Sequence, residues 1–529
     1  MPQVSFGLEL QKMGEPPDVW QQFEQVILPF EPMDHQWDGF YRSRSNARSG
    51  LFFEPRTGKT LVLQMLAIFF ARYGSGTIQI MPPALFRQFQ HDYHLIKGHG
   101  LKVEVLNQGP AGRKTLLNKW RDQPHSRPQV VLVSKEIFKV VWQDLYFLGF
   151  TNTHFDESHL GLQNHDSQIA KALRAFINQH DENRLVLSTG TPLANQIRNS
   201  FATLNLLYPE IYRTQGAFDS THVTFKKIWI PDPRRPGETR TIQVVDSYYN
   251  LEYLSQVLYW HAVWVSKLEV LSLEAPNIQR IECVLTPKHR RLYNQAINER
   301  LLEIEGDILD LREAQKLRQV ALQLISVPSA FADDYDDSDN SLYHTVAALL
   351  DSVNTDVNKV VVFANYIKSV EHLEKMFKHL RPAKVYGPNG PTKNAMEVER
   401  FHTEDACRIL IANPQSGGAG FKLGDICSTV VFAEPVSTPG LMDQCVSRVM
   451  LLGQTNAVVV YIVEVVGTIS PIAIDNMLNK VKDINKVMGA KRSLFDALLG
   501  KEVKYEEGPY EGLDLDSEEI EEAEWRQAA

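Results

Sequence analysis

The residues Gly58, Lys59 and Thr60 stand between an apolar stretch at 51–53 and apolar residues that recur at helical spacing over 61–69. At such a strand–turn–helix junction the free main-chain N–H groups and the positive end of the helix dipole face an anion. Lys59 would reach the outer phosphates of a nucleotide, and the Thr60 hydroxyl would hold Mg²⁺. An ordinary helix start is the alternative for these three residues alone, because the fuller pattern has a further glycine five residues before Gly58.

A second pair of chemistry-bearing residues, Asp156 and Glu157, directly follows an apolar stretch at 150–155. In open parallel sheets ligands bind at the carboxyl ends of the strands, and Lys59 and Asp156 both follow such ends. A phosphate-holding lysine beside a Mg²⁺-binding aspartate is the minimal set for nucleotide hydrolysis, and Glu157 would orient and deprotonate the attacking water. For the acidic pair alone, the alternative is a helix cap with a favourable dipole partner.

The elements that must position these residues alternate between strands and helices, which predicts parallel sheets with helices on both faces. Strands are expected in the first half of the chain at 77–81, 103–106, 130–134, 150–155 and 184–188. From about 200 to 300 the sequence reads mostly helical and aromatic-rich, with a polar loop at 231–241. The alternation restarts further on, with strands expected at 359–363, 383–386, 408–412, 429–432 and 458–463.

Composition limits the possible classes of protein. With 529 residues the chain is too long for one core, so two or more domains are expected. The net charge of −9 argues against a bulk polyanion-binding surface, but it allows a local basic groove. The four cysteines are scattered and form neither a metal-binding pair nor a disulfide framework, so a reducing compartment fits. No apolar run is long enough to span a bilayer, and no signal-peptide pattern opens the chain.

Further motifs follow one another in a specific order. They are His35-Gln36, Gly58-Lys59-Thr60, Met81 to Leu85, Val133-Ser134, Asp156 to His159, Ser188 to Asn195, Val361 to Phe363, Ser416 to Gly420, and Gln444 with Arg448 and Gly453-Gln454. In this order and spacing the chain resembles the Swi/Snf-type helicase-like ATPases of helicase superfamily two. The resemblance runs from about Phe30 to about Ile469.

The resemblance implies an α/β fold of two RecA-like lobes, each a parallel sheet flanked by helices, with helical insertions. The implied divisions are an N-terminal extension (1–29), an ATP-binding lobe 1 (30–275) with a helical insertion (200–275), a helical linker with a flexible acidic loop (276–345), lobe 2 (346–495) and an acidic tail (496–529).

The resemblance also implies roles for single residues, with ATP and Mg²⁺ as cofactors. The catalytic set is Lys59, Asp156, Glu157 and Arg448, with Arg448 on the γ-phosphate. The nucleotide-binding set is Gln36, Thr57, Gly58, Lys59, Thr60, Gly418 and Gln444. Thr60 and Asp156 would hold Mg²⁺. Nucleic acid would contact Thr189, Thr191, Gly417 and Gly420.

One departure from the family pattern concerns the rate of hydrolysis. The family has two arginines three residues apart at the end of the last motif, where this chain has Arg448 and Leu451. The second arginine usually stabilises charge on the transferring phosphoryl group, a contribution of roughly a thousand- to a hundred-thousand-fold. Either Arg448 acts alone, or hydrolysis is slow or absent. Leu160 also replaces the basic residue that the family usually places after His159.

The resemblance predicts an ATP-dependent, DNA-stimulated translocase that moves on or remodels duplex DNA or chromatin. Its expected partners are double-stranded DNA and, beyond that, nucleosomes or other proteins, with no membrane. A second hypothesis, motivated by Leu451, is a nucleotide- and DNA-binding scaffold with impaired hydrolysis. A strand-separating helicase is the third, ranked last because the sequence shows no wedge. The resemblance implies the nucleus as the location, with the cytoplasm as the alternative.

Overall fold

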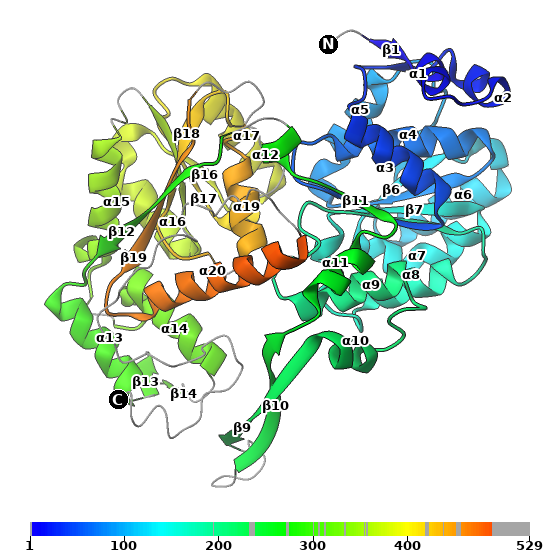
Figure 1. Ribbon diagram of the computed structural model, residues 1–529. Coiled ribbons are helices and arrows are strands. Elements are labelled where there is room, and N and C mark those ends of the chain that lie inside the picture. Colours follow the sequence, from blue (N-terminus) through cyan, green and yellow to red (C-terminus); the bar gives the residue numbers. More distant parts are fainter. Residues whose placement is uncertain are drawn as a thin grey trace. The chain divides into compact units, whose positions relative to one another are not determined.

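The computed structural model divides the chain into two compact units, each with its own parallel sheet (Figure 1). It describes residues 3–488 except 194, 232–238, 271–273, 300, 305–306, 311–313, 333–334, 354, 356–357, 418–422, 437 and 451–455. Unit 1 comprises residues 1–221 and 250–273, and unit 2 comprises 222–249 and 274–529. The predicted fold class, two parallel α/β sheets flanked by helices, is confirmed. The predicted acidic tail, 496–529, lies outside the described residues.

The sheet of unit 1 has seven parallel strands. In spatial order they are β11 (Ala262–Val265), β3 (Arg48–Phe53), β8 (Arg184–Ser188), β7 (Phe150–Asp156), β4 (Gly76–Ile80), β6 (Val130–Val133) and β5 (Val103–Val105). All strands that the sequence predicted in this half are present. The closing strand β11 was missed because four residues in an aromatic-rich stretch give too short a periodic signal.

Helices cover both faces of this sheet (Figure 1). They are α3 (Asp34–Ser45), α4 (Lys59–Arg72), α5 (Phe86–Leu95), α6 (Pro110–Asp122), α7 (Lys135–Phe147) and α8 (Gln168–Ile177). Helix α4 is apolar on all sides and is buried along ten consecutive residues, 61–70, as expected of a helix enclosed by a core. It packs with α3 against one sheet face, where the core includes Leu51, Leu132 and Val186.

The first thirty residues pack into the core of unit 1. Strand β1 (Val4–Ser5) pairs with β2 (Ile27–Leu28), and helices α1 (Phe6–Lys12) and α2 (Pro17–Trp20) lie between them. The Phe6 ring lies 5.3 Å from Phe23, 6.0 Å from Trp37 and 5.7 Å from Phe40, measured between centroids. Phe23 stacks on Phe69 of α4 at 5.4 Å. This segment therefore braces the two helices, α3 and α4, that flank the turn at Gly58.

The stretch 200–275, expected to be mostly helical, contains strands as well as helices. Its helices are α9 (Phe201–Leu207), α10 (Gln215–His222), α11 (Leu251–Leu258) and α12 (Lys267–Val270). Between them, β9 (Val223–Pro231) and β10 (Thr239–Tyr248) form an antiparallel ribbon that pairs with no other described strand. β-Branched and aromatic residues are frequent on both arms, which favours strands over helix here. Most of the predicted polar loop, 232–238, lies outside the described residues.

Unit 2 contains a six-stranded parallel sheet. Its spatial order is β12 (Asn277–Cys283), β19 (Val459–Val465), β18 (Cys427–Phe432), β15 (Lys359–Phe363), β17 (Ile409–Ala412) and β16 (Ala383–Val385). A short hairpin joins β13 (Leu301–Ile304) to β14 (Asp307–Asp310). The helices are α13 (Pro287–Glu299), α14 (Ala314–Ser326), α15 (Ser341–Ser352), α16 (Ile367–Met376), α17 (Gly390–Thr403), α18 (Pro414–Gly417), α19 (Pro439–Ser447) and α20 (Ile469–Met488).

The acidic stretch 332–340 was expected to be a flexible loop, but its described residues form specific hydrogen bonds. The Asp337 carboxylate accepts hydrogen bonds from the Ser329 main-chain N–H, at 3.0 Å, and from the Ser329 hydroxyl. Asn340 is buried and its side chain caps α15. Acidic composition alone did not reveal these partners. Among the described residues, no helix combines the length and apolar character needed to cross a membrane.

Truncating Phe6 tests whether the N-terminal segment belongs to the unit 1 core. We expect Phe6→Ala to destabilise unit 1 by about 3–5 kcal/mol, because it removes a fully buried ring that contacts three others. Leu8→Ala on the same helix is the control, since Leu8 is 50% exposed and its loss should cost within about 0.5 kcal/mol. Urea unfolding of the full chain measures both. Equal midpoints for the two variants would contradict the packing described.

Candidate functional site

The turn between β3 and α4 has the geometry of an anion cradle. Thr57 folds back on the end of β3, donating from its hydroxyl to the Glu54 carbonyl at 2.8 Å. Gly58 then adopts a left-handed conformation, φ 88°, and α4 begins at Lys59. A Cβ atom at Gly58 would lie 1.9 Å from the Gln36 amide nitrogen, so both the dihedral and the space require glycine. Thr60 follows in the first turn of the helix, where main-chain N–H groups have no helical partner.

Two residues at the start of α3, His35 and Gln36, contact main-chain carbonyl groups of this turn. His35 Nε2 lies 2.7 Å from the Thr57 carbonyl oxygen, and Gln36 Nε2 donates to the Gly58 carbonyl at 3.2 Å. Gln36 Oε1 accepts from the Met33 main-chain N–H at 2.8 Å, so both ends of this buried amide are engaged. The structure thus places Gln36 on the turn itself. Its predicted contact with the nucleotide stays a prediction.

Lys59, Asp156 and Glu157 come together as the sequence predicted. The Lys59 ammonium lies 3.5 Å from the Glu157 carboxylate, and its positive charge also acts on Asp156. Lys59 is 9% and Asp156 6% exposed, so both charged groups are largely withdrawn from water. The Ser188 hydroxyl, from the end of the neighbouring strand β8, donates to Asp156 at 3.0 Å. Three residues from two sequence motifs therefore converge at the carboxyl ends of β3 and β7.

Asp156 is a buried carboxyl group whose pKa is raised. Burial is the main cause that raises the pKa of Asp156 to about 6, and the neighbouring Glu157 charge adds to the rise. Lys59 and the Ser188 hydrogen bond lower the pKa, but they do not compensate fully for burial. The Asp156 carboxylate and the Thr60 hydroxyl, in the first turn of α4, are hard oxygen donors of the kind that Mg²⁺ prefers, so the types of donor fit a magnesium ion.

His159 connects the acidic pair to the next motif. Its Nδ1 atom lies 2.8 Å from the Thr189 hydroxyl and 3.5 Å from a Glu157 carboxylate oxygen. Burial lowers the pKa of His159, which favours the neutral ring. The Thr191 main-chain N–H donates to the Thr189 hydroxyl at 3.1 Å. Thr189 is 1% exposed and its hydroxyl is engaged inside the unit, while Thr191 is half-buried, and their contacts with nucleic acid remain predictions.

The predicted residues of unit 2 lie on or near α19. Gln444 is on this helix, and Arg448 follows its last turn. The Arg448 carbonyl accepts from the Leu423 main-chain N–H at 2.8 Å, which joins this turn to the segment that follows the glycine motif. Gly417 ends α18. Gly418, Gly420 and Leu451 lie outside the described residues.

Sequence reasoning missed a buried carboxylate in unit 2. Glu434, two residues beyond β18, accepts from the Asn365 main-chain N–H at 2.5 Å and from the Ser369 hydroxyl at 2.6 Å. The Asn413 side chain, just after β17, donates to the Asn365 carbonyl at 2.6 Å. Burial raises the pKa of Glu434. An acidic residue right after an apolar strand was the available signal, and it is the same signal that identified Asp156.

Replacing Asp156 should have opposite effects on the free energy of unfolding and on nucleotide binding. Its pKa in the folded protein, about 6, lies above the ordinary pKa of an aspartate, so its contribution to stability is present below about pH 4 and is lost as the pH rises through 6. Asp156→Asn should therefore stabilise the ligand-free protein at pH 7.5 by about 2–3 kcal/mol while abolishing Mg²⁺-dependent nucleotide binding. Thermal unfolding from pH 4 to 8 measures the difference. A destabilised variant at pH 7.5 would refute this account.

Comparison with a family model gives a match to the SNF2-related domain over residues 39–375, well over half of the chain. The chain is 23% identical over 470 residues to the CHD3-type chromatin-remodeling factor CHR7 of Arabidopsis thaliana, covering 84% of this chain and 36% of that protein. It is 23% identical over 372 residues to the DNA repair and recombination protein RAD54 of Saccharomyces cerevisiae, covering 64% and 40%. The chain thus spans less than half the length of these curated relatives.

Among solved structures, the Sulfolobus solfataricus SWI2/SNF2 ATPase core in complex with dsDNA matches with 15% identity, covering 87% of this chain and 97% of that one, at a TM-score of 0.37. This global superposition is weak. The match to the family model is therefore the evidence for the family. The matched residues include the turn at Gly58, the acidic pair Asp156-Glu157 and the motif from Ser188 to Asn195. The resemblance inferred from sequence motifs is confirmed: the chain belongs to the SNF2-related domain family of Swi2/Snf2 ATPases.

Proposed function

We propose that this chain is an ATP-driven translocase that couples ATP hydrolysis to movement on, or remodelling of, duplex DNA or chromatin. The observation that carries the proposal is the convergence of Lys59, Asp156 and Glu157 at two adjacent strand ends, with Lys59 3.5 Å from Glu157. Family membership supports it, because the family match covers residues 39–375, a range that includes these three residues.

The site residues divide the work of hydrolysis. Bound Mg²⁺–ATP supplies the phosphoanhydride bond that is cleaved. The N–H groups of the turn at Gly58 and the Lys59 ammonium bind the phosphates, while Thr60 and Asp156 hold the magnesium ion. Binding of phosphate draws Lys59 away from its ion pair, which leaves the Glu157 carboxylate to orient water and accept its proton. Thr57, Gly418 and Gln444 complete the proposed nucleotide contacts, and Arg448 meets the γ-phosphate.

Duplex DNA is the nucleic acid on which we propose that the protein moves. The support is the relatives' names, one for chromatin remodelling and one for DNA repair and recombination. We place the contacts at Thr191, at Thr189 once its link to His159 opens, and at Gly417 and Gly420, whose missing side chains allow a close phosphate approach. Nucleosomes or other proteins are further proposed partners. The same names favour the nucleus as the location, with the cytoplasm as the alternative.

Leu451 favours a second candidate function, a nucleotide- and DNA-binding scaffold whose hydrolysis is impaired. Leucine carries no charge, so it cannot neutralise a developing phosphoryl charge as the family's second arginine does. Lys59, Asp156 and Glu157 argue against this alternative, because an assembled hydrolytic set has no use in a protein that only binds.

Steady-state ATP hydrolysis, with and without double-stranded DNA, tests the proposed motor. The wild type should turn over ATP faster with duplex DNA, and Lys59→Ala should abolish this turnover, because phosphate loses its only positioned ammonium in the turn. Lys139→Ala is the control, since Lys139 is an exposed lysine on α7. Wild-type protein that binds ATP but shows no turnover under either condition would favour the scaffold.

Restoring the second arginine tests how far Leu451 limits the rate. We expect Leu451→Arg to raise kcat by at least about tenfold, since a positioned guanidinium stabilises the transferring phosphoryl group. Leu451→Lys should raise it less, because a lysine lacks the planar fork that pairs with phosphate oxygens. Rapid-quench single-turnover measurements report the chemical step directly. Unchanged single-turnover rates in both variants would show that Arg448 suffices alone.

A further inference from the structure

Strand β16 is the edge strand of the unit 2 sheet, and its outer side is a row of main-chain groups. Ala383 and Val385 are the rungs that face β17, and the Val385 carbonyl accepts from the Asn413 N–H at 2.9 Å. In a parallel strand, alternate residues direct both of their main-chain groups to the same side. The groups of Pro382, Lys384 and Tyr386 therefore point away from the sheet, where another strand could add.

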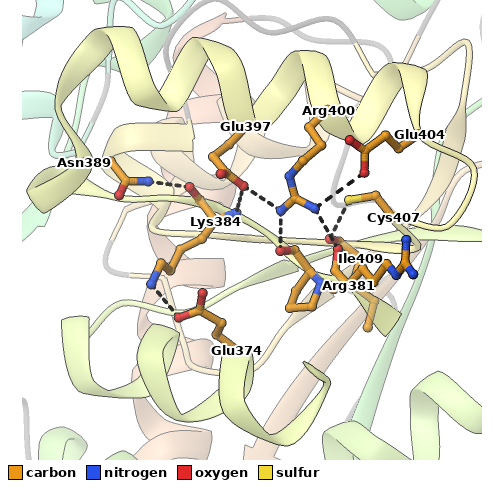
Figure 2. Close-up of polar contacts among 10 residues, drawn as sticks. Glu374, Arg381, Lys384, Asn389, Glu397, Arg400, Glu404, Cys407 and Ile409 are labelled. Atoms are coloured by element: carbon orange, nitrogen blue, oxygen red, sulfur yellow. Dashed lines mark hydrogen bonds and ion pairs between the residues drawn. The ribbon is translucent and has the colours of Figure 1, made fainter. Parts of the chain in front are cut away.

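Side chains occupy both outward groups of Lys384 (Figure 2). Its N–H donates to the Glu397 carboxylate of α17 at 3.1 Å. Its carbonyl accepts from the Asn389 side-chain amide at 2.6 Å, from the loop that leads into α17. The Lys384 ammonium pairs with Glu374 of α16, which puts a fixed charge pair beside the same edge.

Asn394 of α17 covers the next outward residue, Tyr386. Its side-chain oxygen accepts from the Tyr386 N–H at 3.2 Å, and its side-chain nitrogen donates to the Tyr386 carbonyl at 3.2 Å. A side-chain amide carries the same donor and acceptor as a peptide group. Asn394 thus takes the place that one residue of an added strand would occupy.

Arg400, one and a half helical turns further along α17, covers the start of the edge. It donates to the Arg381 carbonyl at 3.1 Å and to the Pro382 carbonyl at 2.6 Å. It also donates to Glu397 at 2.7 Å, which fixes the carboxylate that accepts from Lys384 (Figure 2). Pro382 has no N–H to offer. All five outward main-chain groups of Pro382, Lys384 and Tyr386 therefore have a partner.

We propose that α17 seals this sheet edge against strand addition by a second copy of the chain. The inner side of α17 packs on the sheet through the buried Val398 and Phe401. The polar residues Asn394, Glu397 and Arg400 do something different, because they bond main-chain groups that a partner strand would otherwise bond. The β16 edge of a second copy is the natural occupant, since without these side-chain bonds it would offer the same row of main-chain donors and acceptors for a symmetric pairing.

Opening the seal should make the chain self-associate. In Asn394→Ala with Glu397→Ala, three outward groups lose their partners: the Lys384 N–H and both groups of Tyr386. Sedimentation velocity and light scattering over a concentration series should show the weight-average mass of the full chain rising about twofold relative to the wild type, as for a symmetric dimer. Amide exchange should locate the contact, with the Lys384 and Tyr386 amides exposed at low concentration and protected at high concentration.

Thr392→Ala with Glu399→Ala is the matched control, because both residues are exposed on α17 and the charge change is the same. It should sediment as the wild type does. If the double Ala variant fails to fold, Asn394→Asp keeps the acceptor for the Tyr386 N–H and removes only the donor to its carbonyl, and it should give a smaller rise in mass. A folded, open-edge variant whose mass and amide exchange match those of the control would overturn the proposal.

Discussion

One rung of the unit 1 sheet sets the position of nearly everything in the candidate site. In the parallel register, Leu51 of β3 lies beside Ser188 of β8, and Ser188 lies beside Asp156 of β7. Three motifs that are far apart in sequence therefore end at the same level of the sheet. At this level of the sheet the chain leaves β3, β7 and β8 and enters the turn before α4, the acidic pair and the segment that begins at Thr189. Strand pairing therefore brings Lys59 and Glu157 close together.

The two buried carboxylates at strand ends show how the same placement serves two purposes. Burial raises the pKa of both Asp156 and Glu434. Glu434 is bonded by an N–H and a hydroxyl at 2.5–2.6 Å, and it joins the loops that follow β15 and β18. Asp156 has one hydroxyl partner at 3.0 Å and a lysine that a phosphate would draw away. The two carboxylates therefore differ in their partners: those of Glu434 lie just after β15 in unit 2, whereas the positive charge that acts on Asp156 comes from Lys59, the proposed phosphate ligand.

Features encoded locally could be predicted from the sequence. Most strands of the two sheets, with the exception of β11 and β12, follow from short apolar runs. The turn at Gly58 follows from Gly58-Lys59-Thr60 between a strand and a helix. Asp156 and Glu157 could be placed because the carboxyl ends of parallel strands share one edge. The register beside Ser188 and the 3.5 Å contact of Lys59 with Glu157 needed the structure.

Features that depend on distant partners could not be predicted. Strand β11 is recognisable only beside β3, and the ribbon of β9 and β10 only through the pairing of its two arms. The aromatic residues of the first thirty positions have no local pattern that connects Phe6 to Phe40. The hydrogen bond from the Gln36 side chain to the Gly58 carbonyl likewise depends on where α3 lies relative to the turn. Each of these contacts joins two segments that are distant in the sequence, whereas secondary-structure propensity describes each segment separately.

The late position of β11 has a consequence for the order in which the protein is made. The Glu54 N–H bonds to the Val265 carbonyl, and its carboxylate accepts from the Lys267 N–H, 213 residues further along the chain. During synthesis, β3 therefore emerges early and remains an open edge until the ribbon and α11 have also left the ribosome. The nucleotide turn is among the first segments translated, yet its last support arrives when half of the chain exists. Because pairing between distant segments forms slowly, β3 stays unpaired on its β11 side until residues 262–267 have been made.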